Sequence, residues 1–194
     1  MADHNRIGFH FRERMIGPLS ADTDDPRTGA ERGRAAGTIF VADLRVSIDD
    51  LAACVRDPQH RAHLGGTATF PGLATAQPLL DGQLMMYVPE PTSGAKLMRY
   101  LFSFHSDDGR AYFLDGTKVI HTPGAPAREQ VTLYTRVHSG GPDGPVWGAG
   151  VLVFRVRDLP AFLLSMRADG ASRLQGLWAF LGFARQELTT PAVA

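Results

Sequence analysis

The stretch GRAYFLDGTKVI, residues 109–120, has the alternation of a β-strand but carries a lysine on its apolar face. A period of two places Lys118 on the same side as Tyr112 and Leu114, the side expected to face the interior. An ammonium group in a dry interior can orient a carboxylate or hold a polar ligand. Lys118 is therefore a candidate functional residue.

A glutamate occupies the equivalent position in the stretch GFHFRERM near the N-terminus. Glu13 alternates in phase with Phe11 and Met15, so it also is expected to point inward. In a barrel of eight strands the first and sixth strands lie across the lumen, which would bring Glu13 and Lys118 together. Burial of either charge alone is costly, so the two should pair with each other or flank a shared cavity.

Two interpretations of this pair follow from the sequence. The structural one is an internal salt bridge that serves only to neutralise both charges. The functional one is an acid/base or ligand-anchoring pair whose pKa values are displaced by the dry interior. Both stay open at this point.

The histidines do not suggest a metal centre. In a meander of strands, His105 and His138 end at one rim while His121 ends at the opposite rim. His60 and His63 could share a helix face, but only a cysteine stands nearby as a third ligand. Neither a phosphate-binding glycine motif nor a GxSxG nucleophile motif occurs. We expect no metal and no cofactor.

Composition limits the kind of protein and its partners. A chain of 194 residues with 44% hydrophobic and 21% charged residues suits one globular domain spanning 1–194. Twenty basic residues balance twenty acidic ones, which disfavours nucleic acid and anionic membrane surfaces as partners. With a single cysteine, no secretory signal and no membrane-spanning run, a cytoplasmic location without membrane insertion is expected.

The polar and apolar pattern predicts a mainly β protein with few helices. Many strands of similar length favour a closed antiparallel, lipocalin-like β-barrel of about eight strands, because closure removes unpaired edges. A two-sheet sandwich is the structural alternative. The predicted strands are approximately 6–16, 34–47, 66–70, 81–88, 97–105, 111–120, 130–138 and 147–157.

The sequence also predicts which side chains line the interior. In the hairpin LMRYLFSFH-SDDG-RAYFLDGTKVI, the alternation points one set of residues inward and leaves Arg99, Ser103 and Asp115 outside. The interior set would contact an apolar small molecule. The candidate ligand-binding residues are Phe11, Met15, Met85, Met98, Tyr100, Phe102 and Tyr112.

Two further segments are expected to flank the barrel. Residues 18–37 are rich in Gly, Pro and Asp and nearly free of large apolar side chains, which predicts a long loop. Residues 172–188 predict a C-terminal helix with one apolar stripe, which Phe180 and Phe183 widen. The stripe consists of Leu174, Leu177, Trp178, Leu181 and Leu188. This stripe must dock on the barrel or on a partner, so a homodimer through the helix is one expectation.

Five motifs, spaced along most of residues 8–188, resemble a known family domain. They are FHFRERMIG, VRDPQHRAHLGG, MRYLFSFHSDDGRAYFLDGTKVI, TLYTRVHSG and GAGVLVF. The chain is similar to the accessory β-rich region of long bacterial glucose-methanol-choline (cholesterol-oxidase-like) oxidoreductases, and Glu13 and Lys118 match that pattern. The chain has no flavin-binding fingerprint. The resemblance therefore implies a module that serves hydrophobic, steroid-like or lipid-like substrates.

The leading functional expectation is a barrel that encloses a polyketide-, steroid- or lipid-like molecule and promotes a cofactor-independent cyclisation or isomerisation. Glu13 and Lys118 would be its polar, catalytic handles. A non-catalytic carrier or an accessory domain of an oxidoreductase is the alternative, and a purely structural subunit is the third. A lumen filled by side chains would favour the structural reading, whereas an open cavity containing both charges would favour an enzyme or carrier.

Overall fold

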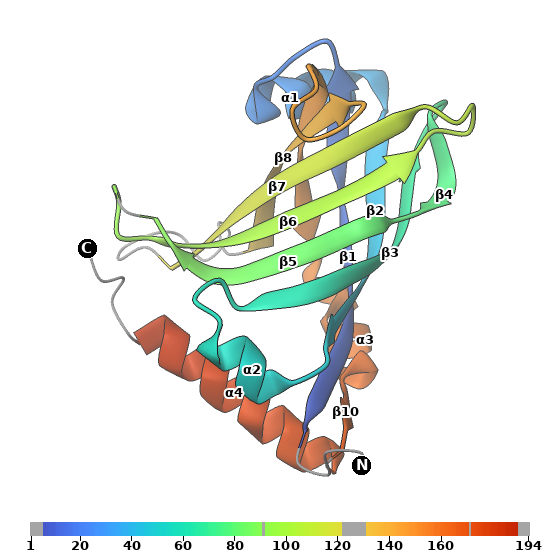
Figure 1. Ribbon diagram of the computed structural model, residues 1–194. Helices are drawn as coiled ribbons and strands as arrows, with labels where there is room; N and C mark the ends of the chain where they lie inside the picture. Colours follow the sequence, from blue (N-terminus) through green and yellow to red (C-terminus); the bar gives the residue numbers. More distant parts are fainter. Residues whose placement is uncertain (1–5, 91, 122–130, 171, 190–194) are drawn as a thin grey trace.

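The computed structural model describes residues 6–90, 92–121, 131–170 and 172–189, which form a closed antiparallel β-barrel flanked by helices (Figure 1). Eight strands make up the barrel: β1 (Gly8–Ala21), β2 (Ile39–Ile48), β3 (Arg61–Phe70), β5 (Leu80–Pro89), β6 (Lys96–His105), β7 (Ala111–His121), β8 (Thr132–Ser139) and β9 (Val146–Phe154). Each pairs with the next, and β9 pairs with β1 to close the barrel. The predicted barrel is confirmed, and the two-sheet sandwich is wrong.

Two short strands lie off this closed path. β4 (Ala74–Pro78) pairs with β3, and β10 (Arg167–Asp169) pairs with the first residues of β1. β1 is long enough to pair with β10 near its start and with β9 over its second half, so it links the barrel to the C-terminal segment.

The β6–β7 hairpin has the predicted orientation. Tyr100, Phe102 and Leu114 are at most 1% exposed, and they point into the barrel. On the outer face of the same two strands, Arg99 and Asp115 form an ion pair at 2.9 Å. The alternation of side chains along these strands therefore sets the register that places Lys118 inside.

The middle of the barrel is a packed core. Met15, Tyr100, Phe104 and Leu152 have an exposed fraction of 0%, so no space large enough for a water molecule touches them. Aromatic rings contact one another across the interior, for example Phe104 stacked on Tyr112 with ring centroids 5.7 Å apart. Packing of this kind leaves little open volume in this part of the lumen.

The predicted loop over 18–37 is wrong, because the segment is ordered and mostly regular. β1 continues to Ala21, and α1 (Pro26–Ala36) follows and packs against β1 and β9 at one end of the barrel (Figure 1). Asp25 caps the helix by accepting a hydrogen bond from the Thr28 backbone N–H at 2.7 Å. The buried contact surface of α1 consists of small residues, so the segment lacks the large apolar side chains that usually signal a helix.

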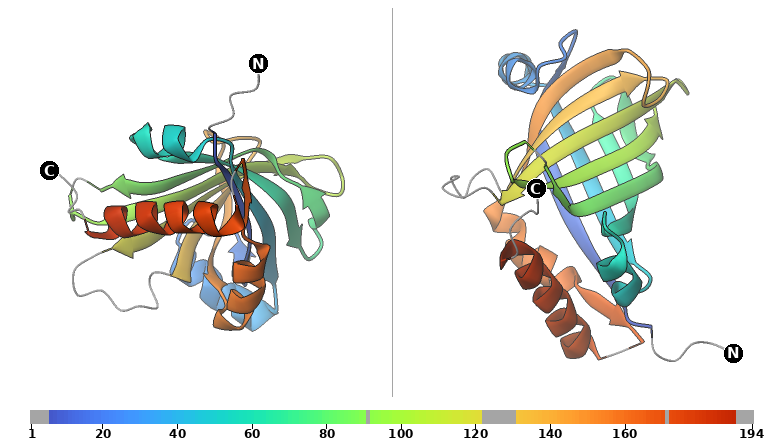
Figure 2. Two further views of the ribbon diagram at one scale, coloured as in Figure 1. Left: turned by 90° about the horizontal axis from the view of Figure 1, so that it is seen from below. Right: turned by 60° about the vertical axis from the view of Figure 1, so that its left-hand side comes forward.

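α4 (Arg173–Thr189) lies across the opposite end of the barrel, next to α2 (Leu51–Arg56) and α3 (Leu159–Ser165) (Figure 2). Phe180 stacks on Phe9 with centroids 4.4 Å apart, and Phe183 contacts the Tyr87 ring at 5.5 Å. The predicted helix over 172–188 is confirmed, because α4 begins and ends one residue later than predicted.

The predicted apolar stripe of α4 is partly wrong. Phe183 is buried, and Leu177 and Phe180 pack half-buried against the core as expected, but Leu174 is 67% exposed, Trp178 is 72% exposed and Leu181 is 44% exposed. The side chain of Leu188 lies outside the described residues. The helix carries apolar side chains around most of its circumference, so a stripe could not be assigned from sequence alone. The exposed side is the surface through which a homodimer was expected, and that association stays a prediction.

Glycines on α1 allow a close approach to β9, and this gives a test of the fold. A Cβ atom added at Gly29 would lie 2.0 Å from the Ala149 carbonyl oxygen, a backbone atom that cannot move cheaply. We expect Gly29→Ala to lower the free energy of unfolding by about 1–3 kcal/mol in urea denaturation, although alanine is the better helix former.

Gly141→Ala is the matched control, because a Cβ there meets nothing within 4 Å. Its effect should stay within about 0.5 kcal/mol. Equal stability of the Gly29→Ala variant and wild type would contradict the close packing of α1 on β9.

Candidate functional site

Glu13, Tyr100 and Lys118 form a buried polar cluster inside the barrel. The Lys118 ammonium donates to Glu13 Oε1 at 3.1 Å, and the Tyr100 hydroxyl donates to Glu13 Oε2 at 2.9 Å. The Lys118 Nζ atom also lies 5.2 Å from the centroid of the Tyr100 ring, within the range of a cation–π contact. The expected pairing of Glu13 with Lys118 is confirmed.

Barrel closure brings these residues together from distant parts of the chain. Glu13 is on β1, Tyr100 is on β6 and Lys118 is on β7, where Met98 lies directly opposite it in the sheet. All three site residues follow the inward alternation of their strands. β1 therefore presents its carboxylate across the lumen toward a hydroxyl and an ammonium group on neighbouring strands.

Burial fixes the protonation state of the phenol in this cluster. Removal from water raises the pKa of Tyr100 well above its usual value of 10, and the adjacent Glu13 charge raises the pKa further. The phenol consequently keeps its proton at neutral pH and donates it in the hydrogen bond to Glu13. Glu13 thus accepts one hydrogen bond at each carboxylate oxygen.

Lys118 has unused hydrogen-bonding capacity. An ammonium group carries three N–H donors, and among the described residues Lys118 makes a single hydrogen bond, to Glu13. The Lys118 side chain is 6% exposed and that of Glu13 is 8% exposed, so a small part of each is accessible to water. Tyr100 is 0% exposed. The cluster is able to accept a further polar partner at Lys118.

Most of the predicted ligand-binding residues belong to the same barrel interior as this cluster. Phe11, Met15, Phe102 and Tyr112 are buried in the core with exposed fractions of 5% or less. Met98 is half-buried and packs against the same core. The structure therefore brings five of the predicted apolar residues and Tyr100 into one interior.

Met85 was predicted to line the interior, and this prediction is wrong. It is half-buried, whereas its neighbours Leu84 and Met86 are at most 1% exposed and belong to the core. Leu84 lies opposite the inward-facing Tyr100, and this register turns Met85 to the outer side of β5. The methionines of LMMY gave no unique phase in the sequence, because the pairing partner of Leu84 was not known.

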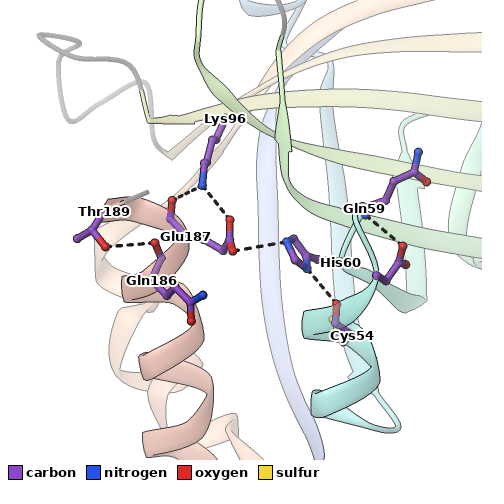
Figure 3. Close-up of polar contacts among 8 residues, drawn as sticks. Cys54, Gln59, His60, Lys96, Gln186, Glu187 and Thr189 are labelled. Carbon is purple, nitrogen blue, oxygen red and sulfur yellow. Dashed lines mark hydrogen bonds and ion pairs between the residues drawn. The ribbon is translucent and has the colours of Figure 1, made fainter. Parts of the chain in front are cut away.

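Sequence reasoning missed a second buried charge cluster, which holds α4 on the barrel (Figure 3). The Lys96 ammonium donates to the Glu187 carboxylate at 2.8 Å and also to the Glu187 backbone carbonyl. His60 lies 3.7 Å from the other Glu187 oxygen, and its Nδ1 atom is 2.9 Å from the Cys54 carbonyl oxygen. These contacts tie the end of α4 to the start of β6 and to the segment after α2.

A signal for this second cluster was present in the sequence. Lys96 alternates in phase with Met98 and Tyr100, as Lys118 does with Tyr112. Glu187 follows Phe183 by one helical turn, so it lies on the docked face of α4. The same rule that selected Lys118 would have selected Lys96.

The part of the chain that the structure describes contains no group of three or more His, Cys, Asp and Glu side chains positioned to hold a metal ion. The side chain of His121 lies outside the described residues. His105 is exposed at its strand end, and His138 contacts the Gly144 carbonyl oxygen at 2.9 Å.

Comparisons with known proteins add no assignment. A scan against protein-family models, a search of curated proteins and a search of solved structures each returned no match to this chain. The resemblance to the oxidoreductase accessory region therefore stays an expectation. Within the described residues, no helix has both the length and the apolar composition that crossing a bilayer requires.

The buried pair predicts large effects from single substitutions. Glu13→Gln leaves the Lys118 charge without its counter-charge, and Lys118→Met does the same to Glu13. We expect each variant to lose about 3–5 kcal/mol of unfolding free energy in urea titrations. The exterior Arg99–Asp115 pair of the same hairpin is the matched control, and Arg99→Gln with Asp115→Asn should cost about 1 kcal/mol or less. Similar losses of unfolding free energy at the Glu13–Lys118 and Arg99–Asp115 pairs would contradict the prediction that burial makes the interior pair more important for stability.

Alkaline pH should destabilise the fold, because the buried Cys54 thiol and Tyr87 hydroxyl keep their protons in the folded state. Burial raises the pKa of Cys54 to about 11 and that of Tyr87 to about 12, helped by the nearby charges of Asp57 and Glu187. The folded state then holds protons that the unfolded chain releases from about pH 9 upward, so stability falls as pH rises from 9 to 12. Urea midpoints measured from pH 8 to 11.5 check this prediction. In the Cys54→Ala/Tyr87→Phe variant the urea midpoint should fall less steeply with pH than in the wild type. A wild-type midpoint that does not change with pH would contradict the prediction.

Proposed function

We propose that the barrel binds an apolar small molecule that carries one polar group, at the end covered by α4. The polar group would be held by the Glu13–Tyr100–Lys118 cluster. The observation that carries this proposal is the ammonium of Lys118, a buried charge with hydrogen-bond donors left over among the described residues. A ligand carbonyl, hydroxyl or carboxylate supplies the acceptor that these donors lack.

The distribution of half-buried apolar residues supports the location. Met98, Ile120, Leu177 and Phe180 pack against the core without being fully buried, and they belong to the strands and helix at this end. Near the opposite end, Trp147 is also half-buried against this core. A ligand would replace part of the contact between α4 and the barrel, and flexible methionine side chains such as Met98 adapt readily to a new neighbour.

The lumen beyond the cluster is filled by side chains, and by the criterion set out from the sequence this favours the purely structural interpretation. Between a carrier and an enzyme, the filled lumen favours binding without chemistry. Binding of this kind would suit a carrier or an accessory module for a hydrophobic substrate. The arrangement needs only that the ligand reach Lys118, whereas catalysis needs room for a substrate to change shape beside the cluster.

Cofactor-independent isomerisation or cyclisation is the second candidate, and the alignment of three polar groups favours it. For an isomerisation, the Glu13 carboxylate would accept a proton from a carbon next to a ligand carbonyl, while Lys118 stabilises the resulting enolate oxygen. Return of the same proton from Glu13 to another carbon completes the reaction without an oxidant. Tyr100, which keeps its proton, would orient the carboxylate as a positioning residue.

A fluorescence titration tests the binding proposal. The probes are dehydroergosterol, which has one hydroxyl group, and cis-parinaric acid, which has one carboxylate. We expect saturable binding of at least one probe to the wild type and at least tenfold weaker binding to Glu13→Gln/Lys118→Met. The exterior variant Arg99→Gln/Asp115→Asn should bind as the wild type does.

The Tyr100→Phe variant provides a second test in case the double variant does not fold, because this substitution removes only a hydroxyl group. A folded Tyr100→Phe protein should bind the probes more weakly than the wild type. Binding that is unchanged in both interior variants, or no saturable binding of either probe to the wild type, would overturn the proposal.

A further inference from the structure

A groove runs over the outside of the barrel, between the outer face of β1–β3 and α3. It encloses about 860 Å³ and continues into a second hollow of about 630 Å³, with Arg12, Arg45 and Ser165 lining both. α3 lies beside β1 (Figure 1) and forms one wall. The side chains of Arg12 and Arg45 lie outside the lumen, because they point outward from strands whose intervening residues point inward. The groove also borders Glu13, whose carboxylate pairs with Lys118 inside the barrel.

Two arginines stand directly opposite each other on the floor of this groove. Arg12 on β1 is the cross-strand partner of Arg45 on β2. Like charges in this arrangement repel each other. Among the described residues, neither guanidinium group has a hydrogen bond or an ion pair, so both forks are free to bind an anion.

The acidic residues of the groove do not neutralise this pair. Asp43 is engaged by Arg14 at 3.4 Å, and Asp158 lies 3.9 Å from Arg157. The neighbouring Asp169 contacts His10 at 2.5 Å. Glu13, which also borders the groove, pairs with Lys118 at 3.1 Å, so each of these carboxylates has a basic partner of its own. Among the described residues, the groove arginines without an acidic partner are Arg12, Arg45 and Arg167, and Arg167 donates instead to two backbone carbonyl oxygens.

The rest of the groove combines open space with an apolar wall. Gly65 is the cross-strand partner of Arg45 on its other side, and a Cβ added there would meet nothing within 4 Å. The wall contains Phe162, whose ring contacts Phe154 at 5.6 Å. Ser165 fixes the wall to the floor by accepting a hydrogen bond from the Arg12 backbone N–H at 2.8 Å.

We propose that this groove binds an organic oxyanion, a carboxylate or a phosphate ester, that carries an apolar chain or ring. The Arg12 and Arg45 guanidinium groups bind the oxyanion, because their planar forks match its oxygens. The space beside Gly65 admits the head group, and the apolar part lies against Phe162. The binding site is distinct from the lumen and does not depend on the function proposed for it.

Calorimetric titrations with octanoate, octyl phosphate, 1-octanol and inorganic phosphate test this assignment. We expect saturable binding of octanoate or octyl phosphate, and the tighter of the two identifies the head group. The neutral alcohol and the bare ion should bind at least tenfold more weakly. The Arg12→Gln/Arg45→Gln variant should lose at least tenfold in affinity for the alkyl anions, whereas Arg34→Gln, an exposed arginine on α1, should lose none.

Amide chemical shifts separate this site from the lumen. Octanoate should perturb the backbone amides of Gly65, Gly66 and Ser165, and it should still do so in the Glu13→Gln/Lys118→Met protein or, if that fails to fold, in Tyr100→Phe. Affinity for the alkyl anions within twofold of wild type in the arginine double variant would overturn the proposal. Equal binding of 1-octanol, or equal binding of inorganic phosphate, would also overturn it.

Discussion

The requirement that a buried charge be neutralised governs this barrel. Lys118 is inside because the alternation of β7 points it there, and Glu13 is inside for the same reason on β1. Closure of the sheet through β1 and β9 is what lets the two meet across the interior. Register, barrel closure and the ion pair therefore depend on one another, since a shift of one residue in either strand would expose one charge and leave the other buried alone.

The two ends of the barrel are covered by different physical means. At one end α1 approaches the strands closely through glycine and alanine, so its contact relies on shape. At the other end α4 packs aromatic rings and adds the Lys96–Glu187 pair, which fixes the end of the helix. Nearer the middle of α4, Phe180 and Phe183 contact the barrel through their rings. This second arrangement is better suited to admit a ligand, because ring contacts can be exchanged for ligand contacts without leaving a charge unpaired.

The sequence predicted the features that depend on local alternation and missed those that depend on long-range pairing. Glu13, Lys118 and the β6–β7 hairpin follow directly from a period of two, and closure follows from the number of strands. Met85 was misplaced because its phase depends on the register with Tyr100. α1 was read as a loop because small residues form its contact surface, and the docked face of α4 was ambiguous because apolar residues surround the helix.

We propose that the Glu13–Tyr100–Lys118 cluster serves to bind a polar group and not to stabilise the fold. Titration of dehydroergosterol and cis-parinaric acid into the triple variant Glu13→Leu/Tyr100→Phe/Lys118→Met tests this, because the variant replaces the whole cluster by apolar side chains of similar size. We expect its unfolding free energy to lie within about 1 kcal/mol of the wild type or above it, since no unpaired polar group remains, and its affinity for the probes to fall at least tenfold. A triple variant that folds as stably as the wild type and binds both probes equally well would contradict the proposal and leave the cluster as a neutralised structural pair.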